Sequence, residues 1–295
     1  MIYDAALEGI IRSASGPRRI DVKIPHKRCL TALLAVGALV LFSTIDPAIA
    51  ENAEVGIRRS VQRTEFSNNE ITEGFFKIAF GAELQLGRRT DRIRKFEKPI
   101  HVLIVDQGQA NRRAETAAVI ADIRAHVDHL DLRITEDPKS ANLIVYLVRE
   151  HDLNRTIRDV FGRDKAKKIQ QALTPQCLSG FGKDTRYRIL RAAVILPVDA
   201  GDFTFLDCAY EELLQALGPI NDDASIPWTM FNDDVQMGFF DLYDQYLLNI
   251  LYDPRIRPGM TKQEVEVVLP EVLPTVRAWV SNFQEAERLR LSRAD

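Results

Sequence analysis

The chain of 295 residues is 46% hydrophobic and 27% charged, a balance that allows a buried core and excludes a disordered or fibrous protein. Lysine and arginine number 39 against 42 aspartates and glutamates, so no basic surplus favours nucleic-acid binding. Three cysteines are too few for a disulfide framework or a four-cysteine zinc site, and all five histidines lie at or before position 151.

An apolar segment near the N-terminus predicts export. Residues 30–45 carry no charge, follow Lys27 and Arg28, and precede Ala48-Ile49-Ala50, which is the pattern of a secretory signal cleaved near Ala50. This uncharged run is too short for a membrane-spanning helix, which needs about 20 residues. An uncleaved anchor is the alternative, and the chain would then contact the membrane only through this segment. We therefore expect a periplasmic or secreted protein.

Residues 1–21 precede the basic region by an unusual length for a signal. A GTG start codon at Val22 would explain this extension, and N-terminal sequencing of the precursor tests that hypothesis.

The remainder of the chain alternates between strand and helix patterns. A polar lead is expected at 51–68 and a basic linker at 87–98, on either side of an amphipathic helix at 70–84 that packs on the domain. Strands are expected at 100–105, 132–135, 143–148 and 187–198, helices at 110–130, 153–161, 165–173, 205–217 and 239–251, and loops at 174–183 and 220–234. A C-terminal helical region at 262–291 is expected to break near Pro270 and Pro274. This order predicts an α/β domain with parallel strands.

The helix at 205–217 carries the spacing of a metal-binding motif. Glu211, Glu212, Gln215, Gly218 and Asn221 occupy the positions of H-E-x-x-H-x-x-G-x-x-H, in which two histidines share a helix face and a third closes a zinc site. Each histidine is replaced here, by Glu211, Gln215 and Asn221. Only the glutamate, Glu212, and the glycine remain.

The residues after this helix extend the likeness. Met230 stands in Trp228-Thr229-Met230-Phe231, near the distance at which matrixin-type metalloproteases carry a methionine turn, and the helix at 241–252 ends in Leu-Tyr as theirs does. Residues 99–252 thus resemble a matrixin-like zincin domain whose metal site has been lost. The resemblance implies an α/β (α+β) fold with a mixed sheet, a long backing helix and the motif helix, plus flanking N- and C-terminal helices. It also implies that Glu212 is a vestigial catalytic base and that Met230 is Met-turn-like.

Longer strings resemble another family. E-E-L-L-Q-A-L-G, F-N-D and L-Y-D-P-R-I-R-P-G-M are similar to the bacterial domain of unknown function 2927, over about residues 70–270. That family has no assigned activity, and its members look like exported proteins or lipoproteins. We divide the chain into 1–50 (extension and signal), 51–98 (lead, helix and linker), 99–260 (zincin-like domain) and 261–295 (C-terminal helices).

The altered motif argues against a resident metal. One carboxylate with two amides is a weak oxygen set, whereas zinc favours imidazole and thiolate, so neither zinc nor calcium is expected at Glu211, Gln215 and Asn221. The Asn- and Asp-rich stretches at 221–223 and 232–234 lack the order of a calcium loop and are interpreted as turns.

Two cysteines remain after the signal. In an oxidising compartment we expect Cys177 and Cys208 to form a disulfide that pins the 174–183 loop beside the motif helix.

These features predict an exported, non-catalytic zincin-like protein that binds a peptide or an envelope component. A divergent metallopeptidase with an oxygen-ligand metal site and a purely structural envelope protein are the alternatives, separable by metal analysis and by pull-down from periplasmic extract.

Overall fold

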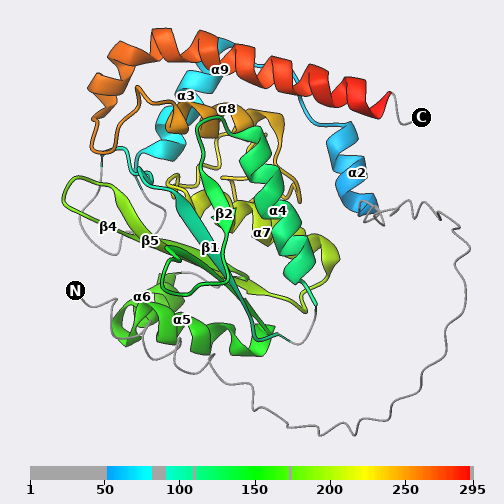
Figure 1. Cartoon of the computed structure of the whole chain (residues 1–295), viewed down its shortest axis with the longest axis vertical. Coiled ribbons are helices and arrows are strands. Elements are labelled where there is room, and N and C mark those ends of the chain that lie inside the picture. Colours follow the sequence, from blue (N-terminus) through cyan, green and yellow to red (C-terminus); the bar gives the residue numbers. More distant parts are fainter. Residues whose placement is uncertain (1–51, 82–90, 109–110, 173–174, 293–295) are drawn as a thin grey trace, which may run out of the picture.

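The computed structural model describes residues 52–81, 91–108, 111–172 and 175–292 (Figure 1). The predicted signal, its cleavage site and the start at Val22 lie outside these residues and stay predictions. Within the described ranges, no helix is both long enough and apolar enough to cross a membrane.

The centre of the molecule is a five-stranded mixed sheet with the order β2-β1-β3-β5-β4. Four strands are parallel, and β4 pairs antiparallel with β5 at one edge. The strands are β1 (Ile100–Asp106), β2 (Leu132–Ile134), β3 (Leu143–Val148), β4 (Leu178–Lys183) and β5 (Ile189–Pro197). Every residue of β3 is buried, because the continuous apolar run is covered on both faces of the sheet.

Helices cover both faces of this sheet and enclose two hydrophobic cores of different size (Figure 1). On one side lie α4 (Arg113–His126) and α7 (Asp202–Ala216), which contact each other and the strands. On the other side lie the shorter α5 (Leu153–Phe161) and α6 (Arg163–Ala172), around a small core that includes Tyr146 and Ile157. The predicted mixed α/β fold with a backing helix and a motif helix is confirmed.

A further layer of helices packs outside α4 and α7. It contains α3 (Asn68–Ala79), α8 (Leu242–Tyr252) and α9 (Lys262–Leu291), and every residue of α8 is buried. Helix α3 approaches α8 closely at Gly74, where an added Cβ would come 1.9 Å from the hydroxyl oxygen of Tyr243. That hydroxyl donates to the carbonyl oxygen of Glu70 at 2.6 Å. The flanking helices therefore share the large core with the motif helix.

Two segments expected to be irregular have regular structure. The lead at 51–68 contains α2 (Ala53–Ser60), which begins at an Asn52 cap and buries Val55. Arg58 and Arg59 lie over the rings of Phe203 and Phe239, and these contacts hold the helix on the body. The segment 174–183, interpreted as a loop because of its glycines, contains strand β4, with a register shift at Gly182 and Lys183.

Two further expectations are corrected. Helix α9 continues through Pro270 and Pro274, since the apolar face that includes Val272 and Val276 is buried and offsets the lost backbone hydrogen bonds. The basic segment 87–98 was expected to be solvated, but Arg94 and Lys95 are buried. The Lys95 ammonium donates to the carbonyl oxygens of Leu251 and Asp253 at 2.8 and 3.1 Å.

Candidate functional site

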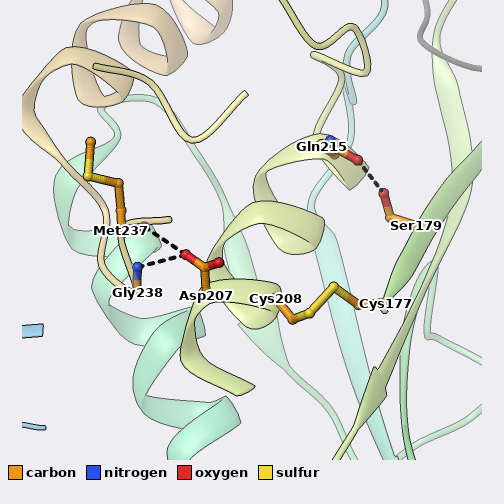
Figure 2. Close-up of a disulfide and its surroundings, with 7 residues drawn as sticks. All are labelled: Cys177, Ser179, Asp207, Cys208, Gln215, Met237 and Gly238. Atoms are coloured by element: carbon orange, nitrogen blue, oxygen red, sulfur yellow. Dashed lines mark hydrogen bonds between the residues drawn. A yellow bond between two sulfur atoms is a disulfide. The ribbon is translucent and has the colours of Figure 1, made fainter. Parts of the chain in front are cut away.

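The motif helix α7 is fixed to the loop that precedes α8 (Figure 2). A carboxylate oxygen of Asp207 accepts from the backbone N–H groups of Met237 at 2.7 Å and Gly238 at 3.0 Å. Burial raises the pKa of Asp207, and the two backbone donors act in the opposite direction. The first half of α7 is thus held in one orientation.

A disulfide joins the same helix to the sheet. Cys177 and Cys208 are bonded, with 5.9 Å between their Cα atoms, which confirms the expected pair (Figure 2). The bond holds the start of edge strand β4 beside α7, rather than a loop as the sequence suggested.

Gln215, the second altered ligand position, links three parts of the structure. Its side chain is only 6% exposed, and its Oε1 accepts from the Ser179 hydroxyl of β4 at 3.3 Å. Its Nε2 donates to the Asp222 carboxylate at 3.2 and 3.3 Å. The amide therefore connects β4, α7 and the 220–234 loop, and both of its polar atoms already have partners.

The chain turns away from α7 at Gly218, which has a φ of 143°. A Cβ at this position would lie 2.2 Å from the carbonyl oxygen of Arg94, so the turn requires glycine. Asn221, the third altered position, then donates its Nδ2 to the carbonyl oxygen of Lys77 in α3 at 2.8 Å. The Asn221 amide is thus engaged with α3, and the neighbouring Asp222 is the residue that contacts Gln215.

Three carboxylates gather beside the motif helix. Glu211, Asp222 and Asp233 each place one carboxylate oxygen within 4.8 Å of the others, and we call them the carboxylate cluster. Burial raises the pKa of Glu211 to about 10, and Glu212 and the two cluster aspartates add to the shift. Glu211 consequently holds a proton at neutral pH, and a bound cation would displace that proton.

The turn that carries Met230 lies next to the 221–223 segment. The backbone N–H of Asp223 donates to the carbonyl oxygen of Phe231 at 2.9 Å. Beneath the turn, Asp244 accepts from the Thr229 hydroxyl and from the Met230 backbone N–H. Met230 is buried, as is Glu212 on α7. Their assignment as a Met-turn-like residue and a vestigial base stays a prediction.

The donor atoms present do not fit a zinc site. Zinc favours nitrogen and sulfur ligands, whereas α7 and its loop supply carboxylates together with amides already used in hydrogen bonds. The carboxylate cluster is a hard oxygen set, of the type that calcium and magnesium accept.

Sequence reasoning missed part of this arrangement. Asp222 and Asp233 were interpreted as turn residues, although their position in an Asp-rich loop after the motif helix was an available signal. Ser179 had no such signal, because its role depends on β4 being a strand next to α7.

Comparison with known proteins gives one match. The sequence model of the family described as "Protein of unknown function (DUF2927)" matches residues 68–271, which confirms the second resemblance noted above. No curated protein and no solved structure shows a significant match to the chain. The likeness to matrixins stays a prediction.

Proposed function

We propose that this chain, which belongs to the DUF2927 family, is an exported zincin-like protein without peptidase activity that binds an extended peptide of the cell envelope along strand β4. The observation that carries the proposal is the position of β4. Among the described residues only β5 pairs with it, and the carboxylate cluster lies beside it.

The edge of β4 offers main-chain hydrogen bonds to a peptide. A strand with one unpaired edge presents a row of N–H and C=O groups, and an extended peptide can add to it as a further strand. The disulfide and the Ser179–Gln215 hydrogen bond fix β4 in place, so binding requires little ordering of the protein.

The carboxylate cluster supports a preference for a basic side chain. Ser179 of β4 contacts Gln215, and Gln215 contacts Asp222 of the cluster. A peptide on this edge therefore passes near three carboxylates, of which Glu211 and Asp222 are partly buried and Asp233 is exposed. A lysine or arginine of the peptide would pair with them and lower the pKa of Glu211 from its raised value.

The loss of peptidase activity rests on the donor chemistry of the motif. The position of the second histidine is occupied by an amide with two hydrogen-bond partners, and that of the third by an amide bound to α3. Without a metal that polarises water and the scissile carbonyl, Glu212 lacks the largest part of the parent mechanism. The zincin-like part of the proposal is supported by the motif helix beside a mixed sheet, the turn at Gly218 and the buried Met230.

Export is supported by the Cys177–Cys208 disulfide, because such bonds persist mainly in oxidising compartments. Cell fractionation together with N-terminal sequencing of the isolated protein tests this part. Recovery of an intact N-terminus in the cytoplasmic fraction would reject it.

Peptide binding is tested with fluorescein-labelled heptapeptide pools whose central residue is fixed as Lys, Gln or Glu and whose other positions are randomised. We expect the Lys pool to bind best by fluorescence anisotropy. Asp233→Asn should weaken it about 3–10-fold, a range that follows from the loss of one charge pair. Asp234→Asn is the matched control, since Asp234 is the exposed neighbour outside the cluster. Equal binding of all pools, or equal effects of the two variants, would contradict the proposal.

The carboxylate cluster favours a second candidate, a divergent metallopeptidase that uses oxygen ligands. Titration calorimetry with Ca²⁺, Mg²⁺ and Zn²⁺ tests it. This candidate requires a dissociation constant below the millimolar range, release of a proton on binding because Glu211 holds one, and hydrolysis of unfolded casein. Absence of metal binding to the purified protein would exclude it.

A further inference from the structure

A cavity of about 950 Å³ opens near the turn after β4, and its lining includes Asn221 and Asp223, the chain neighbours of Asp222 in the carboxylate cluster. It lies between the end of α3, the turn that joins β4 to β5, and the start of α9. Its volume is in the upper part of the range of ligand pockets. The side chains that matter for recognition are Phe76, Phe80, Tyr187, Lys77, Arg92 and Lys262.

Two of the three cationic side chains of the cavity are only loosely neutralised. Arg92 lies 3.9 Å from Glu264, and Lys262 lies 4.0 Å from Glu266, both as exposed pairs that contribute little energy. Lys77 is held more closely, 2.7 Å from Glu73 and 2.9 Å from the Ser225 hydroxyl. Arg92 and Lys262 are therefore the cations available to a ligand with better geometry.

Two carboxylates also line the cavity. Asp223 accepts from the backbone N–H and the hydroxyl of Ser225, so its charge is already stabilised. Asp91 acts electrostatically on the buried Arg94. The described lining thus holds three cations and two anions. A further cation, Arg94, donates to the carbonyl oxygen of Ala79, the residue before Phe80 of the lining.

The start of α9 adds positive potential. Thr261, Lys262 and Gln263 are the cap and the first two residues of this 30-residue helix, and all three line the cavity. The N-terminus of a helix carries a partial positive charge and favours an anionic group. Glu264 forms a capping box with Thr261 and offsets part of that charge, while the N–H groups of the first turn still face this end.

Arg94 is a buried cation next to this lining. It is 3% exposed, and among the described residues its guanidinium makes one hydrogen bond, to the carbonyl oxygen of Ala79 at 3.3 Å. Its Nε has no partner there, and no carboxylate of the described chain lies within 4 Å. Burial lowers the pKa of Arg94 to about 10. Ala79 immediately precedes Phe80 and Gly81 of the cavity, so an anion bound there would act on this charge.

We propose that the cavity binds the C-terminal carboxylate of the peptide, with the apolar or aromatic side chain of its last residue against Phe76, Phe80 and Tyr187. The inference rests on the proposed peptide binding along β4. Strand β4 ends at Lys183, whose Nζ lies 4.2 Å from the centre of the Tyr187 ring, so a peptide that leaves the strand here reaches the cavity. Ser179 is four residues earlier, about 13 Å away along the strand. The basic side chain therefore lies about four residues before the peptide terminus.

The test uses a heptapeptide pool with lysine fixed at the third position, four residues before the last one, in two forms: one with a free C-terminal carboxylate and one with a C-terminal amide. We expect the free acid to bind at least 5-fold more tightly. The double variant Arg92→Gln, Lys262→Gln should remove most of this difference, and both side chains are exposed enough for the protein to fold. The matched control is Arg133→Gln, Lys139→Gln, which removes the same charge from exposed positions near β2, at the opposite edge of the sheet.

The outcomes separate the two proposals. If acid and amide bind equally and Asp233→Asn still weakens both, β4 binds peptide and the cavity does not receive its terminus. If neither form binds, the proposed function fails and this inference fails with it. If 10 mM inorganic phosphate displaces the acid form from the control variant but leaves the amide form bound, the anion site is located in the cavity as proposed.

Discussion

Two groups of acidic residues lie near the Met230 turn, the pair Asp241 and Asp244 and the carboxylate cluster, and they differ in burial and in hydrogen-bond donors. Asp241 and Asp244, at the start of α8, are fully buried, and their oxygens accept from Tyr243, Thr229 and Met230. In the carboxylate cluster, neither Glu211 nor Asp233 accepts a hydrogen bond from the described residues. A buried pair whose donors are supplied by the fold is structural. Asp222 of the cluster does accept from Gln215, but the lack of donors to Glu211 and Asp233 among the described residues lowers stability, and a bound cation or basic side chain would give the cluster a role.

The largest expected effect comes from the disulfide, which joins the start of β4 to α7, the helix that carries Glu211. Replacing both Cys177 and Cys208 with serine should lower the free energy of unfolding by about 3–4 kcal/mol, since a bond across 31 residues constrains the unfolded chain. Urea unfolding of both proteins measures this loss. A loss below about 1 kcal/mol would show that α7 is held without the bond.

Removal of the structural acid should cost almost as much. Asp244→Ala leaves the Thr229 hydroxyl and the Met230 N–H without their buried acceptor, and we expect a loss of about 2–4 kcal/mol. Asp244→Asn is the control, because its single amide oxygen can replace only one of the two acceptor oxygens and should lose less stability. If the alanine and asparagine variants unfold at the same urea concentration, the pair is not the anchor of the turn.

A substitution in the carboxylate cluster is expected to raise the free energy of unfolding rather than lower it. The pKa of Glu211 is about 10 in the folded protein and 4.5 as its ordinary value, so its contribution to stability is present at low pH and is lost as the pH rises between these values. Glu211→Gln should therefore raise the free energy of unfolding at pH 7 by about 1–2 kcal/mol and flatten its decline from pH 5 to pH 9.

Asp241 and Asp244 also have raised pKa values, so the comparison of Glu211→Gln with the parent protein at each pH isolates the cluster. Parallel stability curves for the two proteins would contradict the assignment of a proton to Glu211.

The smallest effect concerns the link between β4 and α7. Ser179→Ala removes one hydrogen bond to Gln215 and should lower the free energy of unfolding by about 0.5–1.5 kcal/mol. Ser179→Thr keeps a hydroxyl and serves as the control. An alanine variant with unchanged stability would indicate that the disulfide alone positions the strand.

Prediction from sequence succeeded where burial and periodicity agree. Strands β1 and β3 and helix α5 lie where their apolar patterns placed them, because each pattern is set by contacts with the core. It failed for β4, since Gly180 and Gly182 weaken the strand signal and pairing with β5 overrides it. Helix α2 was missed because its stability comes from contacts of Arg58 and Arg59 with distant rings.

In the candidate site, too, the sequence predicted local geometry but not contacts between distant parts of the chain. The spacing correctly placed Glu211 and Gln215 on α7, one turn apart, because helix geometry is local. It did not reveal that Asn221 donates to Lys77 of α3, because the direction of the chain after Gly218 depends on the carbonyl of Arg94, more than a hundred residues earlier. The burial of Arg94 likewise has no signature in a segment whose composition is typical of a solvated linker.

The Cys177–Cys208 bond has a consequence for resistance to proteolysis. It closes a covalent ring that contains all of β4, all of β5 and the first turns of α7. A protease that cuts the turn at its exposed residues 185 and 186 would open the ring without releasing a fragment. The nicked chain would keep β4 paired with β5 and would separate into two polypeptides only after reduction. The strand proposed to bind the peptide is thus protected against loss by a single cleavage in this turn.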